Sequence, residues 1–419
     1  MKETLAIVGT GIAGMSSAYF LNEKYDITVF EKNDYIGGHT NTVNVDEDGV
    51  DIPIDTGFMV FNHETYPLLT KLFEKLDVPI KNTDMSFAVR HDPSGWEYNG
   101  SSMSGLFSQR KNIFNPKFIK FLLSIDKFNK SAPQKLKSGE LDKLTIKEYV
   151  EQEKFPKDFY EKFLVPMSAA VWSTPFEKMA NFPAKTLIQF FFNHGFMGLD
   201  TQFQWKTVVK GSETYKQKII KEYKDKIKSN CAIKSAKTND AGKVILKDVH
   251  GNEHTFNKVL FASHADETLE ILDEPTVKQK ELLSCFKYQK NIATMHTDEK
   301  IMPKTKRAWS SWNYIIPPSG EPFTVYYMNM LQGVSEKKDY FININGEQFI
   351  DKSKIIKTIE YTHPLFDFPA VNAQKRLHEL NEEDTPMFFC GSYFRYGFHE
   401  DALMSGVGIS EFLRGEKVL

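Results

Sequence analysis

Hydrophobic positions along the chain predict a parallel β-sheet whose first strand lies close to the N-terminus. Residues 5–8 form a short apolar run typical of a buried parallel strand. Residues 12–21 suit a helix, and a second strand is expected at residues 27–30. Apolar runs at residues 259–263 and 387–392 have the same buried-strand character. One sheet is therefore expected to combine segments that are far apart in the sequence.

Two long tracts between these strands have a different pattern. The first is amphipathic with helical periodicity and many aromatic residues, and the second contains strand-like pieces such as FTVYYMNML at 323–331. We therefore expect an α/β fold in which a Rossmann-like domain is interrupted by a mixed α+β substrate domain. The expected boundaries are 1–86, 205–267 and 375–419 for the Rossmann-like domain, and 87–204 and 268–374 for the substrate domain.

Composition narrows the class of protein. A chain of 419 residues exceeds what one hydrophobic core usually holds, so two domains are expected. The net charge of -2 gives no basic excess that would indicate nucleic-acid binding. Cys231, Cys285 and Cys390 are far apart and predict neither a disulfide framework nor a zinc motif. The first strand begins almost at Met1 and no apolar run reaches 18 residues, so we expect a cytoplasmic protein without a signal peptide or a membrane span.

A glycine motif connects the first predicted strand to the first predicted helix. Gly9, Gly11 and Gly14 form G-x-G-x-x-G. The first glycine permits a tight turn, the second lets the backbone approach a pyrophosphate, and the third lets the helix pack closely. Glu31 ends the second strand, near the position where an acidic residue binds a ribose hydroxyl. The order of these parts predicts a dinucleotide site, with the phosphates at the helix N-terminus.

Three further segments could hold the rest of a long cofactor. Gly37 and Gly38 would let a loop pass tightly over the nucleotide. Thr56 and Gly57 follow a short alternating strand. Near the C-terminus, Gly391-Ser392 precedes a helix whose start could face a second phosphate or a ribityl chain. NAD would not need this C-terminal return to the site, whereas FAD would, so the pattern favours FAD.

These motifs together resemble the flavin-containing amine oxidase superfamily, which also includes protoporphyrinogen oxidase and phytoene desaturase-type enzymes. The resemblance rests on GTGIAG at 9–14, Glu31, the double glycine, DTG at 55–57 and CGSYFRYGFHEDALMSG at 390–406, and it covers essentially the whole chain. Phrases such as PMSAAVWSTP, HTDEKIMP and GFHEDALMSG are similar to a bacterial branch that resembles the flavoprotein domain fused in plants to cyclopropane fatty-acid synthases. Members of that branch are linked with fatty-acid methylation and with furan or cyclopropane lipids.

The resemblance implies FAD as the cofactor and a Rossmann-like FAD-binding domain interrupted by the mixed α+β substrate domain. His39 departs from the pattern, because arginine commonly follows the double glycine, and Ser392 stands where aspartate is common. Ser392 can still form hydrogen bonds. The residues expected at FAD are Gly9, Gly11, Ile12, Ala13, Gly14, Glu31, Lys32, Gly37, Gly38, His39, Thr56, Gly57, Gly391, Ser392, His399, Glu400, Asp401 and Ala402.

The candidate catalytic residues are Lys290, Tyr396 and His399. Lys290 falls roughly where many amine oxidases keep a lysine that holds a water near the flavin; otherwise it is a solvated lysine on a strand. Tyr396 could form a wall beside the flavin, and His399 could act as a general acid or base because its unperturbed pKa is near neutrality. Glu400 and Asp401 could instead cap the final helix. No metal motif is present, so no metal is expected.

Two features indicate an apolar substrate. The second domain contains large rings mixed with neutral polar groups, a composition that fits an apolar substrate pocket and also ordinary packing of a sheet. These residues are Trp309, Trp312, Asn313, Tyr326, Tyr327, Asn329 and Gln332. Residues 106–137 carry eight basic residues and a single acid, Asp126. Phe118, Phe121, Leu122 and Ile125 recur there at helical spacing. This pattern is typical of a helix that lies on a membrane surface, and also of a helix that packs on its own domain.

The leading hypothesis is an FAD-dependent oxidoreductase that oxidises or desaturates a long apolar substrate. The substrate would be a methylated or unsaturated fatty-acyl chain of a membrane phospholipid, reached by a cytoplasmic protein that is peripheral on the inner face of the membrane. Three alternatives stay open: an amine or polyamine oxidase, a flavin-dependent fatty-acid double-bond isomerase, and a non-catalytic flavoprotein partner of a lipid methyltransferase. An amine oxidase would be expected to show acidic groups along a cation tunnel and a lysine that faces the flavin.

Overall fold

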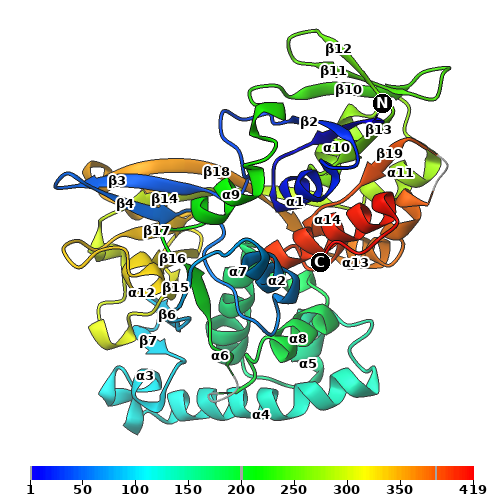
Figure 1. Cartoon of the computed structure of the whole chain (residues 1–419). Helices are drawn as coiled ribbons and strands as arrows, with labels where there is room; N and C mark the ends of the chain where they lie inside the picture. Colours follow the sequence, from blue (N-terminus) through cyan, green and yellow to red (C-terminus); the bar gives the residue numbers. More distant parts are fainter. Residues whose placement is uncertain (1, 199–201, 383–384) are drawn as a thin grey trace.

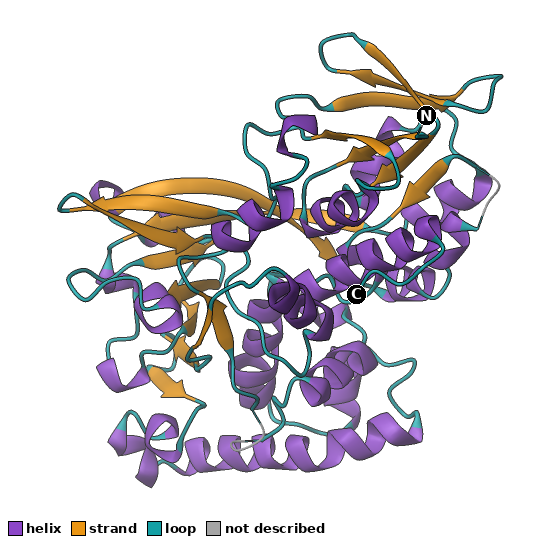
Figure 2. Ribbon diagram, in the orientation of Figure 1, coloured by secondary structure: helices purple, strands orange, loops and turns teal. Residues whose placement is uncertain are grey.

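The computed structural model describes residues 2–198, 202–382 and 385–419, and it contains two principal β-sheets (Figures 1 and 2). The first sheet has five parallel strands in the order β19-β13-β1-β2-β9. These strands are β1 (Thr4–Val8), β2 (Asp26–Phe30), β9 (Ile227–Lys228), β13 (Lys258–Phe261) and β19 (Met387–Phe389). The expectation that distant segments form one parallel sheet is therefore confirmed.

Close packing of small residues fixes the helices on this sheet. Helix α1 (Ile12–Leu21) is buried on nearly every side and packs against α14 (His399–Arg414). A Cβ on Gly14 would lie 2.0 Å from the carbonyl oxygen of Gly9, so only glycine allows the helix to start this close to the strand. Gly406 has the same role between the helices, because its Cβ would lie 2.7 Å from the carbonyl oxygen of Ala13.

The second sheet has seven strands in the order β18-β14-β17-β16-β15-β6-β7 and is mixed, with β15 and β6 parallel and the other neighbours antiparallel. Its strands are β6 (Phe87–His91), β7 (Trp96–Asn99), β14 (Lys287–His296), β15 (Trp312–Ile316), β16 (Phe323–Tyr327), β17 (Phe341–Ile344) and β18 (Ile355–Leu365). The strand-like pattern at 323–331 ends earlier than expected, at Tyr327. Helix α12 (Met328–Gln332) follows, and Gly333 ends it in the left-handed conformation that glycine favours.

A helical layer packs beside the second sheet and contains the long helix α4 (Pro116–Ser138), which runs along the bottom of the view in Figure 1. Its core is rich in phenylalanine. Among the described residues, no helix is both long and apolar enough to cross a membrane. The other helices here are α3 (Met103–Leu106), α5 (Ile146–Gln152), α6 (Lys157–Phe159), α7 (Val165–Trp172) and α8 (Ala184–Asn193).

Smaller elements complete the chain. Three small sheets are formed by β3 (Thr42–Glu47) with β4 (Val50–Asp55), by β5 (Ile80–Asn82) with β8 (Lys206–Val208), and by β10 (Ile233–Thr238), β11 (Val244–Asp248) and β12 (Glu253–Phe256). The remaining helices are α2 (Pro67–Lys75), α9 (Glu213–Ile220), α10 (Ala265–Ile271), α11 (Val277–Leu283) and α13 (Phe368–Gln374).

Each principal sheet takes its strands from one set of the expected domain segments. The parallel sheet uses residues within 1–86, 205–267 and 375–419, and the mixed sheet uses residues within 87–204 and 268–374. The α/β fold with a Rossmann-like sheet and a mixed substrate-domain sheet is confirmed. The exact domain boundaries stay a prediction.

Candidate active site

A cavity of about 960 Å³ is lined by residues of both sheets and of the helical layer. One part of its wall comes from the β1–α1 turn and the ends of β2 and β13. Another part comes from α7, α8, β15, β16, β18 and the segment before α14. The cavity therefore joins the predicted nucleotide site to the substrate domain.

The glycine turn forms the nucleotide part of the wall. A Cβ on Gly11 would meet no atom within 4 Å, so a ligand can approach the backbone there. Gly38 lies beside it, with its Cβ position 3.5 Å from the Cα of Gly11. Among the described residues no side chain caps α1, so its first N–H groups are available to a ligand. Ile12 and Ala13, in the first turn of α1, also line the cavity, and this arrangement suits a pyrophosphate.

Glu31 lines the cavity and also joins the glycine turn to the end of β2. One carboxylate oxygen accepts from the Thr10 backbone N–H at 3.1 Å and from the Thr10 hydroxyl. The other accepts from the backbone N–H and the side-chain amide of Asn33, at 2.9 and 3.0 Å. These four donors hold the carboxylate in place, and a contact with a ribose stays a prediction.

His39 and Thr56 both contact Tyr361 of β18. The His39 ring stacks on Tyr361 of β18, with the ring centroids 4.6 Å apart. The Tyr361 hydroxyl lies 2.8 Å from that of Thr56 and accepts from the amide of Asn41 at 3.0 Å. Gly57 is close to the same loop, because its Cβ would lie 2.4 Å from the carbonyl oxygen of His39. His39 and Gly57 line the cavity, whereas Thr56 supports the wall from behind.

The C-terminal loop brings His399 to the cavity wall. Its Nε2 lies 2.8 Å from the Tyr215 hydroxyl, and its ring stacks on Phe58 with centroids 3.8 Å apart. Burial lowers the pKa of His399 to about 3, so the ring is neutral at physiological pH. Gly391, Ser392, Tyr396 and Ala402 line the same part of the cavity.

Aromatic side chains dominate the part of the cavity that is lined by α7, α8, β15, β16 and the segment before α14. This part is called the substrate part below. The rings of Phe190 and Phe398 stack with centroids 4.8 Å apart, and those of Phe196 and Trp205 lie nearly parallel at 6.3 Å. Trp172 packs on both Phe190 and Phe398, at 4.7 and 5.8 Å. Further rings in this lining are Phe58, Tyr66, Trp312, Tyr326, Phe366, Tyr393 and Tyr396.

A sequence model of the flavin containing amine oxidoreductase family matches residues 12–321. The chain belongs to this family. The chain is thus an FAD-dependent oxidoreductase. No curated protein matches the chain in sequence.

Solved structures share the fold of this chain at low sequence identity. A putrescine oxidase double mutant has a TM-score of 0.70 at 13% identity, covering 99% of this chain and 100% of that one. Cyclohexylamine oxidase from Brevibacterium oxydans has a TM-score of 0.69 at 15% identity, covering 99% and 100%. A CLA-producing fatty acid isomerase from P. acnes has a TM-score of 0.67 at 12% identity, covering 99% of each chain. Such identities show the fold alone, so the substrate has to be argued from the cavity.

The residues that line the cavity fit FAD. The open backbone at Gly11 and the uncapped start of α1 would hold the pyrophosphate, and the wall at Gly391 and Ser392 would hold the middle of the cofactor. When it is bound, FAD supplies the acceptor for a hydride removed from carbon. The protein contributes a cavity wall with many aromatic and neutral hydrogen-bonding side chains.

Two of the expected FAD residues are helix caps in this structure. The Glu400 carboxylate accepts from the backbone N–H groups of Leu68 and Leu69, at 2.8 and 2.9 Å, and so caps α2. Asp401 accepts from the backbone N–H of Phe398 at 2.9 Å and caps α14. Neither lines the cavity. The helix-capping alternative therefore describes both carboxylates, although Glu400 caps a helix other than its own.

The expectation that Lys290 faces the flavin is not met by the structure. Lys290 lies on β14 with 73% of its side chain exposed, and its Nζ forms an ion pair with Glu360 at 3.0 Å. It does not line the cavity. Side chains alternate along a strand, so the neighbouring Asn291 faces inward and is fully buried.

The aromatic lining was only partly predictable. Trp312 and Tyr326 line the cavity, as the mixture of rings and polar groups suggested, but Trp309, Tyr327 and Asn329 do not. The apolar stretch 187–199 is compatible in sequence with the wall of an acyl tunnel or with core, and its Phe190 and Phe196 line the cavity. Sequence reasoning missed Trp172 and Trp205. The amphipathic pattern of residues 184–193 indicated that one face of that helix would be buried, and nothing in the pattern told a core from a cavity wall.

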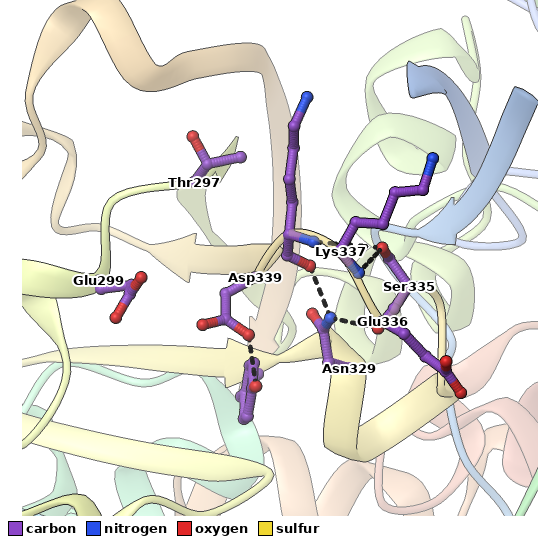
Figure 3. A pocket seen from close by; sticks show the side chains of 9 residues that line it. Thr297, Glu299, Asn329, Ser335, Glu336, Lys337 and Asp339 are labelled. Carbon is purple, nitrogen blue, oxygen red and sulfur yellow. Dashed lines mark hydrogen bonds between the residues drawn. The ribbon is translucent and has the colours of Figure 1, made fainter. Parts of the chain in front are cut away.

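A second hollow, of about 600 Å³, lies near α12 and is polar (Figure 3). Its amide Asn329 donates to the carbonyl oxygens of Ser335 and Lys338, at 2.8 and 2.7 Å. Glu299, Glu336, Lys337 and Asp339 supply charges of both signs. None of the glycine-motif residues lines this hollow, so it is separate from the cofactor cavity.

Proposed function

We propose that this FAD-dependent oxidoreductase oxidises or desaturates a methylated or unsaturated fatty-acyl chain of a membrane phospholipid. The observation that carries the proposal is the aromatic and apolar lining of the substrate part of the cavity. An acyl chain gains free energy in proportion to the apolar surface that it removes from water. The resemblance to a lipid-linked branch supports the same class of substrate.

The distribution of charge in the cavity favours an acyl chain over an amine. The charged residues in the lining are Glu31, Lys32, Lys234, Glu267, Glu270 and Glu360. All except Glu360 belong to the part that includes the parallel sheet, and Glu360 already pairs with Lys290. A protonated amine that leaves water requires a partner of opposite charge. The aromatic part of the cavity offers no such carboxylate among the described residues.

Tryptophan fluorescence tests this substrate class directly. Trp172, Trp205 and Trp312 line the cavity, so a bound acyl chain should change their emission. We expect saturable changes with oleate and with a mid-chain methylated fatty acid, and none with spermine. Trp205→Phe should reduce the change, whereas Trp309→Phe, outside the lining, should preserve it. A saturable response to spermine together with none to either fatty acid would contradict the proposal.

We also propose that the protein meets the membrane through the segment 106–137 and its surroundings. Phe118 and Phe121, which have helical spacing in the sequence, are buried in the core of the helical layer, so the helix packs on its own domain through them. Other apolar side chains are exposed instead, with Phe114 at 88% and Leu123 at 63%. Met103 and Ile113 are also exposed.

Charge around these side chains suits an anionic lipid surface. The basic residues near them are Arg110, Lys111, Lys117, Lys120, Lys127 and Lys130, and Asp126 is the one acid of the segment. Basic residues beside exposed apolar side chains are typical of proteins that lie at a membrane interface. A lipid methyltransferase acting on the same acyl chains is the protein partner that we propose for this enzyme.

A further inference from the structure

His363 on β18 lines the cofactor cavity. Its Nδ1 lies 2.7 Å from Nδ2 of Asn291 on β14. Its ring lies edge-to-face with His39, with the centroids 5.0 Å apart. Nε2 of His363 forms no hydrogen bond with a described residue, and this nitrogen is not fully buried. Nε2 is therefore accessible from the cavity.

A chain of amide groups fixes the orientation of Asn291. The backbone N–H of Ile292 donates to Oδ1 of Asn345 at 2.8 Å. Because a backbone N–H can only donate, Asn345 must present its oxygen there and its NH₂ group elsewhere. That NH₂ group donates to Oδ1 of Asn291 at 2.6 Å. The NH₂ group of Asn291 must therefore point toward Nδ1 of His363.

The same logic fixes the tautomer of His363. An amide NH₂ group has no lone pair to offer, so Nδ1 of His363 must accept its hydrogen bond. In a neutral imidazole the proton then resides on Nε2. Burial lowers the pKa of His363 to about 4, with the nearby His264 acting in the same direction, which keeps the ring neutral. A second proton on Nδ1 would also face the NH₂ group of Asn291.

We propose that Nε2–H of His363 is a fixed, neutral hydrogen-bond donor to an acceptor atom of the bound flavin or substrate, and that Asn291 and Asn345 are the positioning residues that hold it so. A neutral donor whose direction is set before the ligand arrives needs no reorganisation when the acceptor gains charge. The proposal concerns the cofactor cavity and does not depend on which substrate enters it.

The tautomer can be observed in the holoenzyme labelled with ¹⁵N-histidine, with His363→Phe assigning the signal. We expect Nδ1 to resonate as an unprotonated nitrogen and Nε2 as a protonated one. Asn291→Asp replaces the donor by an acceptor of similar shape, so it should place a proton on Nδ1. Asn257→Asp is the control, since the oxygen of Asn257 already accepts from Thr4 and an aspartate can do the same. A native Nδ1 that carries the proton would overturn the proposal.

Two further readouts distinguish the acceptors. If the acceptor belongs to the flavin, His363→Phe should lower the flavin reduction potential and shift its visible spectrum, leaving oleate affinity unchanged. If the acceptor belongs to the substrate, oleate should bind about 2- to 10-fold more weakly, as expected for the loss of one neutral hydrogen bond, with an unchanged spectrum. No change in the potential, the spectrum or the affinity would overturn the proposal.

Discussion

Nε2 of His399 lies 2.8 Å from the hydroxyl oxygen of Tyr215, and this contact connects the start of α14 with α9 at the cavity wall. The Tyr215 hydroxyl also lies 2.9 Å from that of Thr40. Together with the stack on Phe58, these contacts hold His399 as a neutral, buried ring. His399 is thus better suited to hold the cavity wall and to share a hydrogen bond than to carry a charge near neutral pH.

The low pKa of His399 predicts a specific dependence of stability on pH. The unfolded histidine takes up a proton below pH 6.5, whereas the folded one does so only near pH 3. Protonation therefore favours the unfolded chain in this window, and the stability from burying the neutral ring falls as pH decreases. Relative to His399→Asn, the wild type should lose about 1.4 kcal/mol of unfolding free energy per pH unit between pH 6 and 5. Urea denaturation with saturating FAD measures the unfolding free energy of both proteins at each pH. A difference between them that does not change with pH would argue against a neutral His399.

Gly11 and Gly14 should respond differently to the same substitution. Gly14→Ala places a Cβ 2.0 Å from the Gly9 carbonyl oxygen, so it should destabilise the apoprotein and lower its melting temperature. The Cβ of Gly11→Ala meets no atom within 4 Å, so this variant should leave the apoprotein stable. It should weaken FAD binding at least about 10-fold, because the methyl group occupies the space through which the pyrophosphate reaches the backbone. Melting of the apoprotein and titration with FAD separate these effects. If Gly11→Ala and the wild type bind FAD with equal affinity, the pyrophosphate does not bind at Gly11.

Lys290→Met should leave flavin reduction by substrate unchanged within about 2-fold. The Lys290 side chain is 73% exposed, does not line the cavity and pairs with Glu360, and exposed ion pairs contribute little. Anaerobic stopped-flow reduction measures the rate, with Lys287→Met on the same strand as the control. A loss of 100-fold or more would place Lys290 at the flavin and restore its expected catalytic role.

Phe190→Ala should alter selectivity among acyl chains rather than abolish activity. Phe190 stacks on Phe398 and packs against Trp172, so its removal widens the aromatic part of the cavity. The rate of flavin reduction by methyl-branched acyl chains should increase relative to the rate with unbranched chains. Phe192→Ala, which removes a half-exposed ring of the same helix, should leave the ratio unchanged. An unchanged ratio in Phe190→Ala would contradict the assignment of this wall to the substrate.

The exposed apolar side chains near α4 should control binding to anionic vesicles. Phe114→Ser with Leu123→Ser should reduce co-sedimentation with phosphatidylglycerol vesicles, and increasing salt should reduce wild-type binding because the basic residues contribute. Val277→Ser is a matched control, since Val277 is also 88% exposed but lies on α11. If the double variant binds as the wild type does, this surface is not the membrane contact.

Local motifs explain why part of the site could be predicted. Gly9, Gly11 and Gly14 act within one turn, and the helix at Ile12–Leu21 follows from its own sequence. His399 could be placed near the predicted cofactor site because it follows a strand end, and in the structure it lines the cavity. The contact of Glu400 with the first turn of α2 was not predictable, because the residues are 332 positions apart and any helix start could accept such a carboxylate.

Contacts between strands that are distant in sequence explain the rest. Asn291, Asn345 and His363 belong to three segments, and their alignment depends on the register of β14 against β17 and β18. The outward direction of Lys290 depends on the same register, because a shift of one residue exchanges the two faces of a strand. Likewise, Trp172 and Phe398 meet only when the helical layer packs on the C-terminal loop.

The central claim, that the cavity accepts acyl chains for oxidation by FAD, is tested most directly by the flavin itself. The purified holoenzyme is mixed anaerobically with phospholipid vesicles that carry unsaturated or mid-chain methylated acyl groups, and in parallel with spermine and simple amines. We predict loss of the oxidised flavin absorbance with the lipid alone. Bleaching by amines alone would contradict the claim and identify an amine oxidase. An oxidised flavin in every mixture would also contradict it, and double-bond isomerisation or a role as a methyltransferase partner would then become the leading accounts.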